Sequence, residues 1–276
     1  IGVDDKGRTQ FIYSSKHREM STTEKYKRVS ALGTQLHKII NHLKKELKKP
    51  GFTKEKVICL IIILIILTSL RIGNEINRKL YNSHGLSTLL KKHVKTQGTN
   101  GILFEFIGKK GVNNKASIKN KFIHNILTQW LKKFKPLKNE HIFQYIGGDG
   151  NPHKINAADI NKYIKQFGPF TAKDFRTFNA NALLLEELDR IPVVGKNKEE
   201  VKVTHIKKNV TNALKSVAEK LNNTPAICKK EYCCKSIIDD YMDNPPLFKK
   251  SLNKIKNNNK YGKGNKYERG TVFYLK

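Results

Sequence analysis

The feature of this sequence that most restricts its fold is an uninterrupted apolar run, VICLIIILIILTSL, over residues 57–70. A helix built from this run is hydrophobic on every face, so other elements must enclose it. A membrane span takes about 20 apolar residues, which is more than this run provides. We therefore predict a fully buried central helix over residues 53–70, in a mainly α-helical chain with small β elements.

Charge is the second constraint, and it limits what the chain can bind. The sequence has 54 Lys and Arg residues against 23 Asp and Glu, so its net charge is 54 − 23 = +31. These basic residues are spread along the whole chain, which favours a broad basic surface over a basic tail. The natural partner of such a surface is a polyanion, with nucleic acid first and an anionic membrane surface second.

The four cysteines, Cys59, Cys228, Cys233 and Cys234, form no CxxC pair, and no Cys/His spacing resembles a zinc site. They lie in apolar or helical stretches, which is typical of buried, reduced thiols in a reducing compartment. The sequence therefore predicts neither a disulfide framework nor a metal site.

The order of the remaining elements follows from periodicity and capping residues. Residues 1–20 are polar, with a predicted strand over 10–13, and we expect them to be the end of an N-terminal β domain and a linker, the rest of that domain lying outside this sequence. Residues 21–276 are expected to form one α-helical domain. Within it, helices are predicted over about 23–48, 73–81, 121–134, 156–166, 172–188, 197–221 and 224–242.

Two single basic residues are candidates for chemistry. Arg71 follows the central helix directly, so its guanidinium should emerge from a rigid base; a charge favoured by the helix dipole is the ordinary alternative. Residues 102–107 and 112–118 are predicted to pair as a hairpin, with Lys109 in the glycine-rich turn between them. An ordinary solvated lysine is the alternative there.

Two further basic residues share one face of the helix predicted over 172–188. Lys173 and Arg176 stand at positions i and i+3. The nearby Phe175 and Phe178 indicate that this face is partly buried, whereas the alternative is a pair of charges on the surface.

A tyrosine near the C-terminus indicates one reaction in which these cations could take part. In NNTPAICKKEY, residues 222–232, Thr224 and Pro225 open a helix, and Tyr232 lies about two turns further along it. A helical tyrosine in a basic chain is usually a packing residue. The basic motifs upstream favour a second interpretation, in which Tyr232 is a nucleophile directed at a phosphate.

Taken in order, these motifs resemble the small type IB DNA topoisomerases of poxviruses, giant viruses and bacteria. The resemblance covers nearly all of the chain. It implies the catalytic-domain fold shared by tyrosine recombinases and type IB topoisomerases. It also implies relaxation of supercoiled DNA through transient single-strand cleavage, a 3′-phosphotyrosine intermediate and religation, without ATP, metal or any other cofactor. The matching stretches are LRIGNE (70–75), FIGKKGV (106–112), FTAKDFRTF (170–178), NTPAICKKEY (223–232) and, at the end of the N-terminal domain, DDKGRTQFIY (4–13).

The resemblance assigns a catalytic role to five residues. Tyr232 would attack the DNA phosphodiester, and Arg71 and Arg176 would hold its two non-bridging oxygens. Lys109 would be the general acid that protonates the departing 5′ oxygen. Asn223 would donate a hydrogen bond to a phosphate oxygen, where the poxvirus proteins have a histidine.

The resemblance also implies contacts with double-stranded DNA. Gln10 and Tyr13 match DNA-contacting positions, and we assign Lys92 and Lys173 to DNA binding as well. In addition, Lys110 stands where several relatives carry Asp beside the acid. The expected protein is a monomer that clamps DNA together with the N-terminal domain, away from membranes. It would act inside the cell, at a viral replication site, in a virion or at a nucleoid.

Two alternatives to a topoisomerase remain open from the sequence. Tyrosine recombinases share the fold and the tyrosine chemistry, but their second motif is typically HxxR, whereas this chain has Lys173-Asp-Phe-Arg176. A non-catalytic DNA-binding protein would use the same basic surface without the nucleophile.

Overall fold

The central helix predicted from the apolar run is present in the computed structural model. Helix α2 spans Lys54–Thr68, and every residue from Val57 to Ile65 is buried. Thr53 caps its start by accepting a hydrogen bond from the Lys56 amide at 3.2 Å. The helix ends at Ser69, which has a left-handed conformation with φ 56°. An all-apolar helix thus has the enclosed position that its composition requires.

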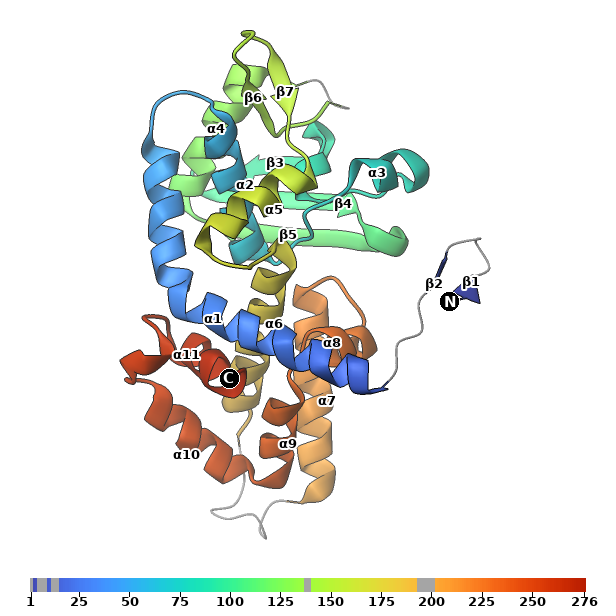
Figure 1. The fold of residues 1–276 in the computed structure, drawn as a ribbon, viewed down its shortest axis with the longest axis vertical. Coiled ribbons are helices and arrows are strands. Elements are labelled where there is room, and N and C mark those ends of the chain that lie inside the picture. Colours follow the sequence, from blue (N-terminus) through green and yellow to red (C-terminus); the bar gives the residue numbers. More distant parts are fainter. Residues whose placement is uncertain (1, 4–8, 11–14, 137–139, 193–201) are drawn as a thin grey trace.

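Helix α2 lies in the part of the molecule that carries the larger sheet, and neighbouring helices pack against it there (Figure 1). The structure describes residues 2–3, 9–10, 15–136, 140–192 and 202–276. The helices in these ranges are α1 (Ser15–Lys48), α3 (Glu75–Tyr81), α4 (Lys121–Phe134), α5 (Ala157–Ile164), α6 (Ala172–Arg190), α7 (Val203–Lys220), α8 (Pro225–Glu231), α9 (Lys235–Asp243), α10 (Pro245–Ile255) and α11 (Lys266–Tyr274). The prediction of a mainly helical fold is confirmed for this part of the chain.

Helix α1 connects the two ends of the molecule. In Figure 1 it crosses the middle of the view, between the sheet-bearing part and the C-terminal helices. It packs against α2, α6 and α11. Its buried face carries Val29, Leu32, Leu36, Ile39 and Leu43, at the spacing of an amphipathic helix.

Three small antiparallel sheets complete the fold. Strands β4 (Gly101–Ile107) and β5 (Asn113–Lys119) form the predicted hairpin, and β3 (Val94–Gln97) adds a third strand on the other side of β4. The second sheet is a hairpin of β6 (Gln144–Ile146) and β7 (Pro152–Lys154). The third pairs β1 (Gly2–Val3) with β2 (Thr9–Gln10).

Some predicted boundaries were wrong. Helix α1 begins at Ser15, not near residue 23. Strand β3 and the pairing of β6 with β7 were not predicted, because these strands are too short to leave a periodic pattern. The strand predicted over 10–13 overlaps β2 only at residue 10, and residues 11–13 lie outside the described part of the chain.

The largest correction concerns the C-terminal helix predicted over 224–242. It is two helices, α8 and α9, separated at residues 232–234. The carbonyl of Cys228 accepts hydrogen bonds from the amides of both Tyr232 and Cys233, which closes the end of α8. Tyr232 therefore lies at a helix end and not on the second turn of a continuous helix.

Trp130 has a packing role, and the cysteines are buried as the sequence predicted. Trp130 is 1% exposed, and its ring nitrogen donates to the carbonyl of Gln144 at 2.8 Å. All four cysteines are buried free thiols.

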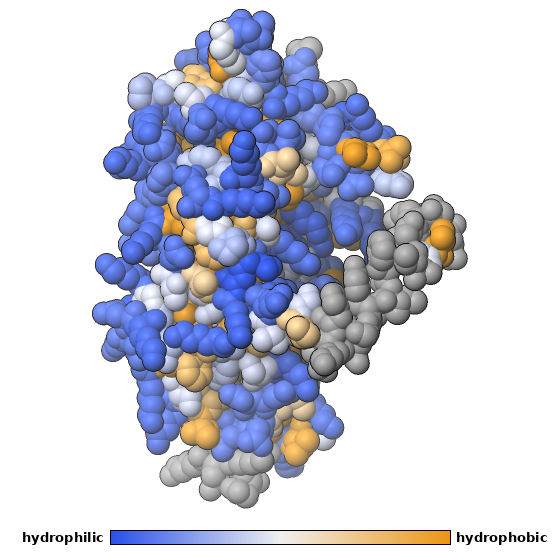
Figure 2. Space-filling view, viewed as in Figure 1, coloured by the Kyte–Doolittle hydropathy of each residue, from blue (hydrophilic) through white to orange (hydrophobic). Residues whose placement is uncertain are grey.

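None of the described helices combines the length and the hydropathy that a membrane span requires. Hydrophilic residues cover most of the face seen in Figure 2.

We predict that the stability of the fold depends on the enclosed faces of α2. Leu64 is fully buried and Leu67, one turn further on, is 47% exposed. Leu64→Ala should lower the free energy of unfolding by about 2–5 kcal/mol, because it removes buried methyl groups and leaves a cavity. Leu67→Ala is the matched control and should cost under about 1 kcal/mol. Equal losses for the two variants in urea denaturation would contradict the enclosed position of α2.

Candidate active site

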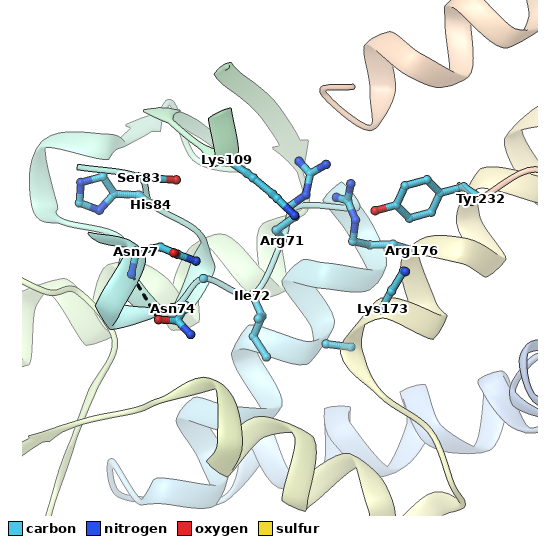
Figure 3. A pocket seen from close by; sticks show the side chains of 12 residues that line it. Arg71, Ile72, Asn74, Asn77, Ser83, His84, Lys109, Lys173, Arg176 and Tyr232 are labelled. Carbon is cyan, nitrogen blue, oxygen red and sulfur yellow. Dashed lines mark hydrogen bonds between the residues drawn. The ribbon is translucent and has the colours of Figure 1, made fainter. Parts of the chain in front are cut away.

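Residues from four distant segments line one cavity of about 350 Å³ (Figure 3). Five of the residues singled out in the sequence are among them: Arg71, Lys109, Lys173, Arg176 and Tyr232. The rest of the wall is formed by Ile72, Gly73, Asn74, Asn77, Ser83, His84 and Ala172. The chain therefore gathers its candidate cations and its candidate nucleophile around one space.

Arg71 lies in a loop that is fixed at both ends. The loop begins at the left-handed Ser69, so α2 ends at Thr68 and not, as predicted, at residue 70. The carbonyl of Arg71 accepts a hydrogen bond from the Leu86 amide at 2.8 Å. Gly73 has φ +95°, and a Cβ there would lie 3.0 Å from the backbone of Gly85, so a close backbone contact fixes this position as glycine.

The other arginine, Arg176, projects from the first turns of α6. At the start of this helix the Asp174 carboxylate accepts hydrogen bonds from the Thr171 amide at 2.8 Å and from the Thr171 hydroxyl at 2.9 Å. Asp174 is also bound by Arg28 of α1 at 3.0 and 3.1 Å. Arg176 is only 3% exposed, and its Nη2 donates to the carbonyl of Leu221 at 3.3 Å. The guanidinium is therefore buried at the cavity wall and hydrogen-bonded to the backbone there, while its Nε has no hydrogen-bond partner among the described residues.

Tyr232 lines the same cavity and lies next to Arg176. Its hydroxyl points toward the guanidinium in Figure 3, and the Arg176 Cζ lies 5.4 Å from the centroid of the tyrosine ring. The residue is 7% exposed. Its phenol therefore stands beside a buried cation, away from most of the solvent.

Charge around Tyr232 favours its ionised form. Burial by itself raises the pKa of the phenol. The charges of Arg176 and Arg71, a hydrogen bond with Arg176 and the charge of Lys173 act in the other direction and outweigh burial, so the pKa lies below its ordinary value. Burial lowers the pKa of Arg176, because the charged guanidinium is removed from water.

Cys228 is the other group near these arginines with the potential to act as a nucleophile. Burial raises the pKa of its thiol to about 11, although both arginines act against this. The neutral thiol is a poor nucleophile. The electrostatics of the site thus favour the tyrosine over the cysteine.

Lys109 reaches the cavity from the turn between β4 and β5. The turn is tight, because the Gly108 amide donates to the carbonyl of Val112 at 2.8 Å and Lys110 has φ 63°. In Figure 3 the Lys109 side chain extends toward Arg71. This placement fits the prediction of a lysine carried on the tip of a hairpin.

The structure does not bring every predicted residue to the cavity. Asn223 does not line it: its Oδ1 accepts from the Thr224 amide at 3.1 Å, and its buried Nδ2 has no hydrogen-bond partner among the described residues. Lys92 is exposed, in a short 3₁₀ helix away from the cavity wall. For Gln10 only the backbone is described, in β2, and Tyr13 lies outside the described residues. The functional roles of all these residues stay predictions.

Other residues that line the cavity were not identified from the sequence. Asn74 caps α3 by accepting from the Ile76 amide at 2.7 Å, which the spacing in GNEI hints at. His84 lines the cavity with its Nδ1 2.8 Å from the carbonyl of Thr88; no sequence signal distinguishes it from a core histidine. In the described ranges, no cluster of three or more His, Cys, Asp or Glu side chains is suited to a metal ion.

Comparison with known sequences identifies relatives among the DNA topoisomerases. The family model for the catalytic core of eukaryotic DNA topoisomerase I matches residues 14–259. A DNA topoisomerase 1B of Acanthamoeba polyphaga mimivirus is 35% identical over 259 residues, covering 90% of this chain and 73% of the relative. The DNA topoisomerase 1B of vaccinia virus (strain Copenhagen) is 23% identical, covering 88% and 72%. Among solved structures, a XerH site-specific recombinase bound to a palindromic difH substrate matches with TM-score 0.43 and 14% identity, over 73% of this chain and 49% of that one.

We predict that the pKa of Tyr232 depends on Arg71. Arg71→Ala removes a positive charge that favours the phenolate, so the pKa of Tyr232 should rise. Phenolate absorbance is measured during an alkaline titration, with the Tyr232→Phe protein subtracted to isolate this residue. Arg190→Ala, which changes an exposed arginine at the far end of α6, is the control and should leave the titration unchanged. An unchanged pKa in Arg71→Ala would show that Arg71 does not act on the phenol.

Proposed function

This chain belongs to the family of type IB DNA topoisomerases, and from that premise we propose that Tyr232 is its nucleophile and that Arg71, Lys109 and Arg176 assist the reaction. The observation that carries the proposal is the convergence of these four side chains, from separate segments, on a single cavity. The substrate is double-stranded DNA, and the enzyme is an isomerase that relaxes supercoils.

The first step is attack of the Tyr232 oxygen on a DNA phosphorus. A bond forms between the tyrosine oxygen and phosphorus, the bond from phosphorus to the 5′ oxygen breaks, and the DNA is left with a 3′-phosphotyrosine. A phenol with an ordinary pKa near 10 is mostly protonated and weakly nucleophilic at neutral pH. The lowered pKa of Tyr232 beside two arginines supports this role.

The two arginines would stabilise the charge that accumulates on the phosphate oxygens. A guanidinium remains protonated, and its planar fork matches two oxygens of a phosphate. Fixed cations that face the developing charge are usually the largest contribution to such catalysis. Cations on the protein can therefore supply the stabilisation, and we propose a reaction that needs neither ATP nor a metal ion.

Lys109 would donate a proton to the departing 5′ oxygen, since an alkoxide is a poor leaving group. Religation reverses the step: the 5′ hydroxyl attacks the phosphotyrosine, and Tyr232 leaves. Asn223 would donate to a phosphate oxygen once DNA is bound. Its buried Nδ2 has no hydrogen-bond partner among the described residues, which supports a donor role that needs a rearrangement of the loop.

DNA would be bound by the basic surface and by residues beside the cavity. Lys173 is exposed at the cavity rim, 4.0 Å from Glu231, so a phosphate could replace that carboxylate. Lys92, Gln10 and Tyr13 would contact the duplex further away. We further propose that the protein acts as a monomer, clamping DNA with its N-terminal part, and works inside the cell where viral or nucleoid DNA is replicated or packaged.

A site-specific recombinase is the second candidate function. It would require paired recombination sites and a synaptic tetramer. The sequence Lys173-Asp-Phe-Arg176, in place of the HxxR typical of recombinases, favours the topoisomerase.

We predict that the protein relaxes supercoiled plasmid in EDTA without ATP. SDS should trap a covalent complex between the protein and a DNA 3′ end. Tyr232→Phe should lose both activities and still bind DNA, because only the nucleophilic oxygen is removed. Relaxation is followed on agarose gels and DNA binding by gel shift. Loss of relaxation in EDTA would refute the metal-free mechanism, and unchanged relaxation by Tyr232→Phe would refute the assigned nucleophile.

We predict a specific defect for Lys109→Ala. Its cleavage rate should fall by about 10²–10⁴-fold, because proton donation to the leaving group is lost. The rate should recover on DNA with sulfur at the 5′ bridging position, since a thiolate leaves without a proton. Lys110→Ala is the matched control: Lys110 lies on the same turn but does not line the cavity, so cleavage should stay near the wild-type rate. Failure of the sulfur substrate to rescue Lys109→Ala would exclude Lys109 as the acid.

A further inference from the structure

The backbone around Tyr232 is held by side chains from outside its own helix. Asn181 of α6, which is fully buried, donates from Nδ2 to the carbonyl of Tyr232 at 2.9 Å. Its Oδ1 accepts from the amide of Cys234 at 2.7 Å. One amide side chain thus binds two backbone groups on either side of the break between α8 and α9.

Two adjacent residues of α1 hold the neighbouring carbonyls. Lys25 donates from Nζ to the carbonyl of Glu231 at 3.2 Å. Tyr26 donates from its hydroxyl to the carbonyl of Cys233 at 2.7 Å. Together with Asn181, these side chains bind three successive carbonyls, of the residues before, at and after Tyr232.

These contacts satisfy groups that the helix leaves without partners. The last carbonyls of a helix have no intrahelical donor, and α8 ends at Tyr232. A continuous helix over 224–242 would have bound them internally. Because the helix breaks here, the position of Tyr232 depends on donors supplied by α1 and α6.

We propose that Lys25 and Tyr26 are positioning residues for Tyr232, through which helix α1 sets where the nucleophile stands relative to Arg176. This proposal rests on the proposed function, in which Tyr232 is the nucleophile. Neither side chain lines the cavity, so both act through the backbone of the nucleophile segment.

The same part of α1 also holds the helix that carries Arg176. One turn of α1 presents Lys25 and Tyr26 to the Tyr232 segment and Arg28 to Asp174 at the start of α6. Nucleophile and phosphate-binding arginine are therefore both positioned against one rigid element. Two parts anchored to the same helix keep their separation better than two parts anchored to different loops.

The Tyr26 hydroxyl keeps its proton over a wide pH range and can therefore remain a hydrogen-bond donor. Burial, followed by the nearby thiols of Cys234 and Cys233 and the carboxylate of Glu231, raises its pKa, so it stays protonated. Lys25 lies 4.2 Å from the centroid of the Tyr26 ring, which keeps the two side chains together. Removing the hydroxyl alone therefore tests the contact while the ring and its packing remain.

The experiment compares Tyr26→Phe with Tyr241→Phe. Tyr241 is a buried tyrosine of α9 whose hydroxyl accepts from Asn209 at 3.1 Å, away from the cavity, so its loss controls for the removal of a buried hydrogen bond. Single-turnover cleavage at saturating DNA, DNA affinity, thermal stability and the pH dependence of cleavage are measured for both. Lys25→Met and Lys25→Arg form a second pair, because arginine keeps a donor and methionine does not.

We expect Tyr26→Phe to cleave about three- to tenfold more slowly than wild type, the effect of losing one hydrogen bond, with unchanged DNA affinity. Its rate should reach half-maximum at higher pH, because the phenol moves away from the arginines. Sulfur at the 5′ bridging position should not restore the rate, in contrast to Lys109→Ala. Lys25→Met should behave like Tyr26→Phe, and Lys25→Arg and Tyr241→Phe like wild type.

Wild-type cleavage and an unshifted pH profile in both Tyr26→Phe and Lys25→Met would overturn the proposal and leave the proposed function intact. Equal slowing in Tyr26→Phe and Tyr241→Phe would also overturn it, because a general loss of stability would then explain the effect. A wild-type protein that forms no covalent complex with DNA would contradict the proposed function itself.

Discussion

The site depends on a buried positive charge that no carboxylate of the described residues neutralises. Arg176 is almost fully enclosed, yet among the described residues the nearby acids are bound elsewhere: Asp174 by Arg28, and Glu231 by Lys173. Burying an uncompensated charge costs several kcal/mol. The guanidinium recovers part of this from the carbonyl of Leu221 and from Tyr232, whose pKa falls in return. A cation held in this way favours any anion that enters the cavity, and it favours the ionised form of Tyr232 for the same reason.

Holding such a charge in place requires a rigid support, and α2 provides it. Its enclosed position fixes the loop that carries Arg71, and Asn179 of α6 donates to the carbonyl of Ile66 at 2.7 Å and to Ser69 Oγ at 2.9 Å at the end of α2. The two arginines are thus tied to each other through the C-terminus of one buried helix. The apolar run that restricts the fold most strongly thus also supports the two arginines that we propose bind phosphate.

Those elements could be predicted from the sequence whose residues form a recognisable local pattern. An all-apolar run, a glycine-rich turn and a capping box each predict structure over a few residues, so α2, the Lys109 hairpin and the start of α6 could be placed. The break after α8 could not, because KEYCCKS contains neither Gly nor Pro, and the groups that stabilise it, Asn181 and Tyr26, are remote in sequence. Asn223 could be assigned to a position in a motif from the sequence, but its orientation could not be predicted, and the residue does not line the cavity.

The position of Tyr232 at a helix end has a consequence for the whole reaction cycle. In the proposed mechanism one DNA strand is covalently attached to this residue during relaxation while the other end rotates, and the attached phosphate must remain where the 5′ hydroxyl can return. A tyrosine inside a continuous helix would be held by that helix alone, and any movement of the helix would carry the phosphate with it. Three hydrogen bonds from two other helices, each contributing about 1 kcal/mol, tie the segment to the same framework as Arg176. The break in the helix therefore exchanges internal hydrogen bonds for contacts that would keep the proposed covalent intermediate beside the groups needed to reverse it.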